Sequence, residues 1–198
     1  MVVGELSGEL TERLQRLQTV LSSVTAQSKV SSAIGGHVWS KLLLNSTFSG
    51  LGAAGGCLYR EIVADPTGRE VALRLWTEGY DIAIALGMEL SEVFGTLPTE
   101  LVVRGRGPWP DTEKALDRLM TRAGATKASM LQDLEHARKT EVDVINGGIV
   151  EAAERIGRKA PLNAELTRII HEYENGLTQP TKESFGRLME VYHNDNNP

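Results

Sequence analysis

The sequence predicts a mainly α-helical protein that begins with a short β-α-β segment. From about residue 33 onward, apolar side chains recur at helical spacing, and Gly, Pro or capping residues separate the helical stretches. Residues 1–32 instead place two short apolar runs around one amphipathic stretch, which is too little chain for a complete α/β domain. We therefore predict three parts: the end of an α/β domain at 1–32, a helical domain at 33–192, and a disordered tail at 193–198.

The N-terminal segment has the order strand, helix, strand. Short apolar runs at residues 1–6 and 28–32 are expected to be strands, and Ser7-Gly8 breaks the chain after the first. Between them, apolar residues recur at the spacing of an amphipathic helix over 11–24, at Leu14, Leu17, Val20 and Leu21. Because a single short strand needs a partner, these elements together indicate a β-α-β unit.

The helix predicted over residues 34–45 organises the rest of the chain, since it is apolar almost all the way round. A helix of that kind is normally buried. Lys41 and Asn45 nevertheless lie four residues apart on one face, with Ser49 one turn further on. An unpaired ammonium is costly to bury, so Lys41 either extends its charge into solvent or finds a partner. The second alternative places Lys41 in a cleft as a proton donor, and both alternatives stay open at this point.

Further helices are predicted from caps and turn residues. Asp65-Pro66 supplies an N-cap and a proline at the first helical position, and that helix ends near Gly87. Before it, the glycines within 49–56 allow the backbone to approach another backbone or a ligand closely. Residues 91–106 are ambiguous, and a loop is expected at 105–110.

The C-terminal half is predicted to consist of amphipathic helices with polar caps. Asp111, Ser129 and Asn163 are assigned as N-caps, Ser129 within a capping-box spacing. A longer helical stretch begins at Thr140 and ends near Gly157, and a last helix begins at Thr181. The apolar stripes of these helices include Ala115, Leu116, Leu119, Met120, Val142, Ile145, Ile149, Ala153, Ile156, Leu166, Ile169, Ile170, Tyr173, Phe185, Leu188, Met189 and Tyr192.

Composition narrows the classes of function. A net charge of −5 and the absence of a basic run give no support to a nucleic-acid partner. No apolar run reaches membrane-spanning length, and the N-terminus does not have the pattern of a signal peptide. The single cysteine, Cys57, excludes an internal disulfide framework and a cysteine-cluster metal site. We therefore expect a cytoplasmic protein with neither a membrane nor a nucleic-acid partner.

Two further polar residues have both a structural and a functional interpretation. Glu141 stands at the head of the long helical stretch, where the helix dipole favours a carboxylate. It shares a face with Ile145 and Gly148, so together with Lys41 it can also form an acid–base pair. Ser129 is assigned first as a cap, and the same helix terminus can receive a carboxylate ligand.

The remaining chemical candidates give weaker signals. His37 is assigned to a different helical face from Lys41, and no two histidines share a metal-ligand spacing with a carboxylate nearby. Cys57 is expected to be a small buried residue rather than a nucleophile. Neither a Gly-x-Gly-x-x-Gly nor a Walker phosphate loop occurs, and Gly50-Leu51-Gly52 follows a predicted helix instead of a strand.

Four motifs, taken together in order and spacing, resemble a known family. They are Trp39–Asn45, Ser129–Asp133, Thr140–Gly148 and Pro161–Asn163. They resemble the C-terminal helical domain of the ketopantoate reductase (2-dehydropantoate 2-reductase) family, which belongs with the 6-phosphogluconate-dehydrogenase-like helical domains. The resemblance extends over roughly Gly4 to Asn175. It implies that 1–32 is a remnant of the end of a Rossmann-type nucleotide-binding domain.

The resemblance implies an oxidoreductase of pantothenate biosynthesis that reduces a 2-keto acid with NADPH. Lys41 would then be the general acid that protonates the keto oxygen, and Glu141 would orient the substrate. Asn45 and Ser129 would bind the polar groups and the carboxylate of the substrate. One turn after Asn45, Ser49 replaces a substrate-binding asparagine of the family, and a further polar position aligns near Tyr59.

Because the phosphate loop is missing, the chain is not expected to hold NADP without a nucleotide-binding domain, which a separate chain could supply. Its expected partners are a small carboxylic or keto acid and a second copy of itself in a homodimer. Two other functions remain open. One is a stand-alone Lys/Glu enzyme that carries out cofactor-free isomerisation or decarboxylation. The other is a non-catalytic helical module for dimerisation or ligand binding.

Overall fold

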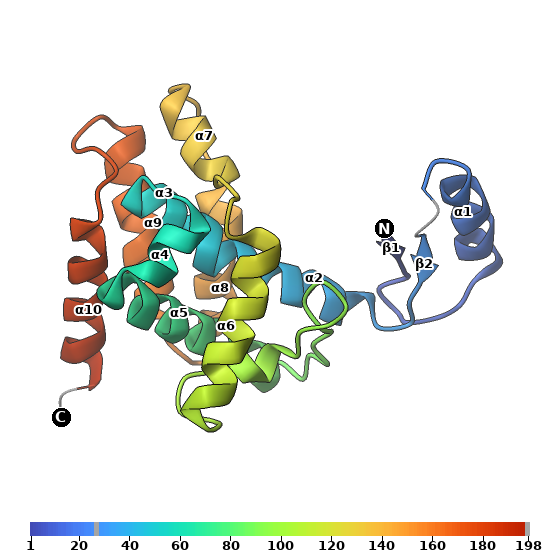
Figure 1. Cartoon of the computed structure of the whole chain (residues 1–198). Coiled ribbons are helices and arrows are strands. Elements are labelled where there is room, and N and C mark those ends of the chain that lie inside the picture. The colour runs from blue at the N-terminus through green and yellow to red at the C-terminus, as the bar shows by residue number, and fades with distance from the viewer. Residues whose placement is uncertain (26–27, 197–198) are drawn as a thin grey trace.

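The computed structural model, which describes residues 1–25 and 28–196, confirms a mainly helical protein with a small β-α-β unit at its N-terminus. Figure 1 shows this unit standing apart from the helical body and joined to it through α2. Its elements are β1 (Val2–Val3), α1 (Glu12–Ser22) and β2 (Lys29–Val30). The body consists of α2 (Ile34–Leu44), a π-helical turn (Asn45–Ser49), α3 (Gly50–Gly55), α4 (Tyr59–Ala64), α5 (Pro66–Ala85), a 3₁₀ turn (Thr99–Val102), α6 (Trp109–Ala123), α7 (Ser129–Glu135), α8 (Val142–Arg155), α9 (Pro161–Glu174) and α10 (Glu183–Asn196).

The two strands pair in parallel, with Val2 opposite Lys29 and Val3 opposite Val30. The Thr11 hydroxyl caps α1 by accepting from the backbone N–H of Leu14, the buried residue of this helix. The predicted amphipathic helix is confirmed, but two residues of its apolar stripe, Leu17 and Val20, are 44% and 64% exposed. A two-stranded sheet is too narrow to cover the whole apolar stripe of a helix, and it is marginally stable by itself.

The hydrophobic core lies where α3 crosses the centre of the helical body. Small residues permit this crossing, since a Cβ at Gly55 would lie 2.6 Å from the Phe185 ring of α10. Trp76 of α5 is fully buried, and its indole N–H donates to the carbonyl of Thr99 at 2.9 Å. The close approach predicted for the glycine-rich stretch is therefore confirmed, although that stretch is helical. The largest fully buried side chains include Trp76, Phe48, Phe185, Leu43, Leu51, Ile62 and Leu73.

The two ends of α5 follow the prediction closely. The Asp65 carboxylate accepts from the N–H of Gly68 at 2.8 Å, and Pro66 is the first helical residue. The helix ends at Ala85, and Gly87 adopts φ 74° just beyond it. Asp-Pro and Gly are local signals, which explains why the sequence alone located both ends.

Three predicted caps are wrong. Pro108, Ala128 and Ala160 occupy the N-cap positions of α6, α7 and α9, and none of these helices has a side-chain cap. Asp111, Ser129 and Asn163 lie inside the first turn of their helices instead. In α6 and α9 a proline at the first or second position allows the helix to start earlier than the polar residue. Consequently Trp109 and Pro110 belong to α6 and not to the predicted loop.

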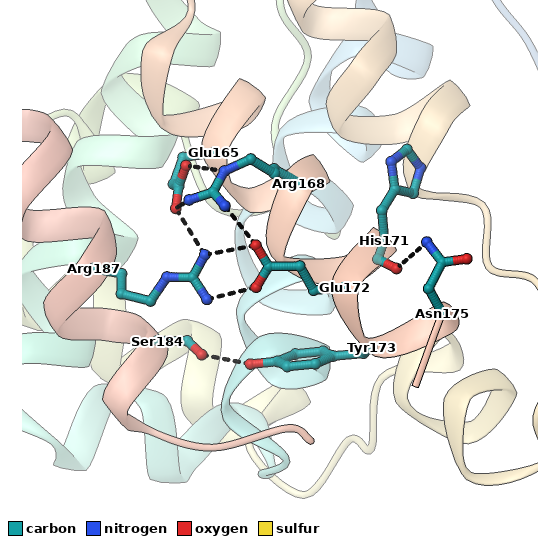
Figure 2. Close-up of polar contacts among 8 residues, drawn as sticks. All are labelled: Glu165, Arg168, His171, Glu172, Tyr173, Asn175, Ser184 and Arg187. Atoms are coloured by element: carbon teal, nitrogen blue, oxygen red, sulfur yellow. Dashed lines mark hydrogen bonds and ion pairs between the residues drawn. The ribbon is translucent and has the colours of Figure 1, made fainter. Parts of the chain in front are cut away.

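The last helix, α10, packs along α9 through charged side chains, as Figure 2 shows. Arg187 of α10 donates to both carboxylate oxygens of Glu172 at 2.8 and 3.1 Å. Glu165 pairs with Arg187 and also with Arg168, which closes a network of four charged groups. Nearby, the Tyr173 and Ser184 hydroxyls lie 2.5 Å apart. The helix runs through residues 193–196 of the predicted tail, while 197 and 198 lie outside the described residues.

Within residues 1–25 and 28–196, no helix combines the length and hydropathy needed to cross a membrane. The same residues contain no cluster of three His, Cys, Asp or Glu side chains that could hold a metal ion. Cys57 is free and buried, as predicted, and burial raises the pKa of its thiol to about 11.

Candidate functional site

The predicted lysine lies at a surface hollow of about 310 Å³ formed by α2 and the segment after α5. The helical wall is lined by His37, Ser40, Lys41, Leu44 and Asn45, and the opposite wall by Glu92, Val93 and Phe94. Lys41 and Asn45 share this hollow because residues four apart lie on one helix face. For the same reason the assignment of His37 to a different face is wrong, since it lies four residues before Lys41.

Lys41 itself is exposed, and none of the ion pairs among the described residues includes it. The prediction of an almost wholly buried helix is therefore wrong for the first half of α2, where Val38 is 57% exposed. The second half enters the core, with Leu43 fully buried. Lys41 sits at this transition, exposed at the edge of the hollow that it lines.

The second wall of the hollow is held against α2 by two close contacts. The buried Ser40 hydroxyl lies 2.6 Å from the carbonyl of Ser91, to which it donates. Gly36 faces the carbonyl of Glu89 so closely that a Cβ there would lie 1.8 Å from that oxygen. The chain then turns sharply, with Phe94 at φ 55° and Gly95 at φ 67°. Sequence analysis missed Glu92 and Phe94 because an irregular segment has no periodicity from which to place it.

Asn45 is half-buried and begins the π-helical turn that ends at Ser49. The Ser49 side chain is buried and forms a hydrogen bond with Tyr59, another buried residue of the predicted site region. Burial raises the pKa of the Tyr59 phenol, and the bond to Ser49 opposes that shift. Ser49 and Tyr59 therefore face each other inside the protein, whereas Lys41 faces solvent.

Ser129 and Glu141 are exposed at the starts of two other helices. Ser129 is the first residue of α7, and Glu141 occupies the N-cap position of α8 without a side-chain cap bond. Neither residue lines the hollow beside Lys41, and no ion pair between Lys41 and Glu141 exists among the described residues. The structure thus brings Lys41 and Asn45 together and leaves Ser49, Ser129 and Glu141 outside that hollow.

Another hollow, of about 530 Å³, lies elsewhere in the described part of the chain. It is formed by the C-terminal ends of α7 and α9, with Arg138, Lys139 and Glu174 among its lining residues. None of the predicted site residues lines it.

Comparison with known proteins identifies the family. The family model described as ketopantoate reductase PanE/ApbA C terminal matches residues 33–174. The chain belongs to the ketopantoate reductase family. All five predicted site residues fall within the matched range, and α10 lies beyond it.

Individual members of the ketopantoate reductase family are distant relatives. A 2-dehydropantoate 2-reductase from Archaeoglobus fulgidus is 25% identical over 175 residues, covering 88% of this chain and 53% of the relative. The chain therefore spans about half the length of this curated relative.

Two solved structures share the fold. D-Mandelate dehydrogenase, in a ternary structure with NADH and anilino(oxo)acetate, matches with a TM-score of 0.70 at 21% identity, over 89% of this chain and 66% of that one. Dimeric ketopantoate reductase from Staphylococcus aureus matches with a TM-score of 0.57 at 20% identity, over 82% of this chain and 52% of that one. At these identities the likeness shows the fold of the ketopantoate reductase C-terminal domain and not its substrate.

Proposed function

We propose that this chain is the substrate-binding half of an NADP-dependent reductase that converts a 2-keto acid into a 2-hydroxy acid. The observation that carries the proposal is the hollow in which Lys41 and Asn45 lie on one helix face, within the range matched by the family. An exposed ammonium beside an amide, above an apolar wall, suits a small acid with a polar head and an apolar side chain. The relative solved with anilino(oxo)acetate supports this class of ligand.

In this proposal Lys41 is the general acid. Its ammonium donates a hydrogen bond to the keto oxygen and transfers a proton to it as the carbonyl carbon is reduced, which leaves a hydroxyl group and a neutral amine. The ammonium also stabilises the negative charge that develops on that oxygen. Asn45 holds a polar group of the substrate. The family resemblance assigns the substrate carboxylate to Ser129 and substrate orientation to Glu141, although both lie outside the Lys41 hollow in this structure.

Ser49 has a supporting place in the proposed site. Its hydroxyl is buried against Tyr59, so it fixes the wall behind Asn45 instead of reaching out to the acid. We therefore propose a 2-keto acid other than or including ketopantoate as the substrate class.

The residues of this chain do not fit the nucleotide. NADPH, when bound, supplies the hydride, and dinucleotide sites place its pyrophosphate on a glycine-rich turn between a strand and a helix. Between β1 and α1 this chain has the exposed Glu9 instead, followed by Glu12 in the first turn of the helix. We propose that a nucleotide-binding domain outside these residues supplies the site, as a part of the same protein or as a separate chain.

The N-terminal unit supports such a docking. On α1, Leu17, Val20 and the neighbouring Val24 are exposed by 44%, 64% and 80%. Apolar side chains gathered in this way on a small unit mark a surface that another element covers. We assign that covering to the nucleotide-binding domain, with residues 1–32 as its last part and 33–192 as the helical domain.

We also propose a homodimer, for which the dimeric relative gives support. Isolated apolar residues on the helical body, Val144 and Leu177, are each 71% exposed. Light scattering at micromolar concentration is expected to give twice the mass of 21.6 kDa. A monomer throughout that range would contradict the assembly without affecting the site. The cytoplasm remains the proposed compartment.

Ligand binding tests the site directly. Ketopantoate and phenylglyoxylate are titrated into the isotope-labelled chain while the NMR signals of α2 are followed. Lys41→Met is expected to weaken binding about tenfold or more, since hydrogen bonds to charged groups contribute about 1.5–3 kcal/mol. Lys114→Met, at an exposed lysine of α6, serves as the control and is expected to bind like the parent. Equal affinity in all three proteins would contradict the role of Lys41. Conversion of the acid without any nucleotide would instead favour a cofactor-free enzyme.

A further inference from the structure

The π-helical turn between α2 and α3 is accompanied by a hydrogen bond from another helix. In a regular α-helix the N–H of Gly50 would donate to the carbonyl of Ser46. Here it donates to the carbonyls of Asn45 and Thr47 instead. The carbonyl of Ser46 accepts from the side-chain amide of Asn146, on α8, at 2.9 Å. The side-chain amide of Asn146 on α8 therefore binds the carbonyl of Ser46, which the Gly50 N–H would otherwise use as its acceptor.

Asn146 is held in place by a buried polar chain that reaches across the protein. Its second amide hydrogen goes to Asn163 Oδ1 at 2.8 Å, and Asn163 Nδ2 donates to Glu78 Oε1 at 2.8 Å. Asn146 and Asn163 are both fully buried. Their side chains can hardly rotate away, because each amide is fixed by partners on other helices.

The region around the π-helical turn also contains features that a continuous α-helix would not require. The Asn146 Oδ1 and Thr47 Oγ1 atoms are buried without a hydrogen-bond partner among the described residues. Gly50 lies so close to α8 and α9 that a Cβ would approach Leu166 to 2.7 Å and Asn146 Oδ1 to 3.2 Å. Unsatisfied buried atoms are unfavourable, and π-turns occur frequently at functional sites.

We infer that Asn146 is a positioning residue, which holds the π-turn and thereby aims Lys41 and Asn45 into their hollow. One inserted residue rotates the helix before it by about 100° relative to the helix after it. Because α3 is fixed in the core, that rotation acts on α2 and on the side chains it carries. Without the π-turn, Lys41 and Asn45 would point away from Glu92–Phe94. The inference rests on the proposed function, since the keto-acid site is what the turn aligns.

A first experiment examines the hydrogen bonds without any ligand. In the deuterated parent, couplings across hydrogen bonds are expected between Asn146 Nδ2 and the Ser46 carbonyl, and between the Gly50 amide and the Asn45 carbonyl. In Asn146→Leu, which keeps the branched shape of the side chain but loses the donor, the Gly50 coupling is expected to move to Ser46. Ile149→Val, at a buried residue of the same helix, is the control and should keep the parental pattern. A Gly50 coupling that stays on Asn45 in Asn146→Leu would overturn the inference.

A second experiment measures phenylglyoxylate binding to the same proteins. Asn146→Leu is expected to lose at least tenfold in affinity, whereas Ile149→Val stays within twofold of the parent. Unchanged affinity in Asn146→Leu would overturn the positioning role. If the Gly50 coupling moves in Asn146→Leu while Lys41→Met binds the keto acid as well as the parent does, that pair of results would contradict the proposed function but would still show that Asn146 maintains the π-turn. If Asn146→Leu does not fold, the coupling from Asn146 to Ser46 in the parent decides, and its absence would overturn the inference.

Discussion

Glu78 on α5 holds the first turn of α9 through Asn163. Its Oε1 atom accepts from the backbone N–H of Asn163 at 2.9 Å and from the Asn163 side-chain amide at 2.8 Å. Its Oε2 atom accepts from the N–H of Leu162 at 3.0 Å. Burial raises the pKa of the Glu78 carboxyl, and these N–H donors oppose that shift. A side chain from another helix thus does what the sequence assigned to Asn163 itself.

Replacing Glu78 by alanine is expected to destabilise the protein substantially. The donors on Leu162 and Asn163 would lose their acceptor in a buried place, and each unsatisfied group costs about 1–3 kcal/mol. Chemical denaturation with urea measures the loss in unfolding free energy. Glu154→Ala, at an exposed position of α8, is the control and should stay within about 0.5 kcal/mol of the parent. Similar losses in both variants would show that Glu78 does not cap α9.

This contact also shows what the sequence could and could not predict. The Asp65-Pro66 start of α5 was predictable because donor, acceptor and proline lie within one helical turn. The cap of α9 was not, because its acceptor lies 85 residues from Asn163 in the sequence. The candidate site divides in the same way. Helical spacing and family resemblance suggested the Lys41–Asn45 wall, whereas Phe94 lies in an irregular turn that only the folded chain brings to it.

Gly36 is expected to tolerate no side chain, because α2 passes too close to the segment that forms the second wall. A Cβ there would lie 1.8 Å from the Glu89 carbonyl oxygen, so the two segments would have to separate. Gly36→Ala should therefore destabilise the protein by about 1–3 kcal/mol. A Cβ at Gly186 in α10 would meet nothing within 4 Å, so Gly186→Ala should raise the free energy of unfolding by about 0.5–1 kcal/mol. Thermal unfolding of the two variants is the measurement, and a stable Gly36→Ala protein would contradict the close contact.

The charged network between α9 and α10 predicts a loss of stability in acid. The Arg187 guanidinium beside Glu172 holds the pKa of that carboxyl below its ordinary value. A lowered pKa stabilises the folded state at pH values above the ordinary pKa, and the contribution disappears as the pH falls through the folded-state pKa. Glu172→Gln should therefore be less stable than the parent at pH 7, by about 1 kcal/mol or less because the pair is near the surface. Urea denaturation between pH 7 and pH 3 should show this difference shrinking toward zero. A constant difference would mean that packing, and not charge, holds α10 in place.

The last prediction concerns the nucleotide. The isolated chain is expected to bind NADPH no more tightly than about 1 mM, because no glycine-rich turn presents backbone N–H groups to the pyrophosphate. Arg13, in the first turn of α1, is already paired with Glu5 at 2.5 Å, and the nearby Glu9 and Glu12 add repulsion. Calorimetry at low and moderate salt measures the affinity, and any weak binding should disappear as salt screens it. Micromolar binding that persists at moderate salt would place a nucleotide site within these residues and remove the need for another domain.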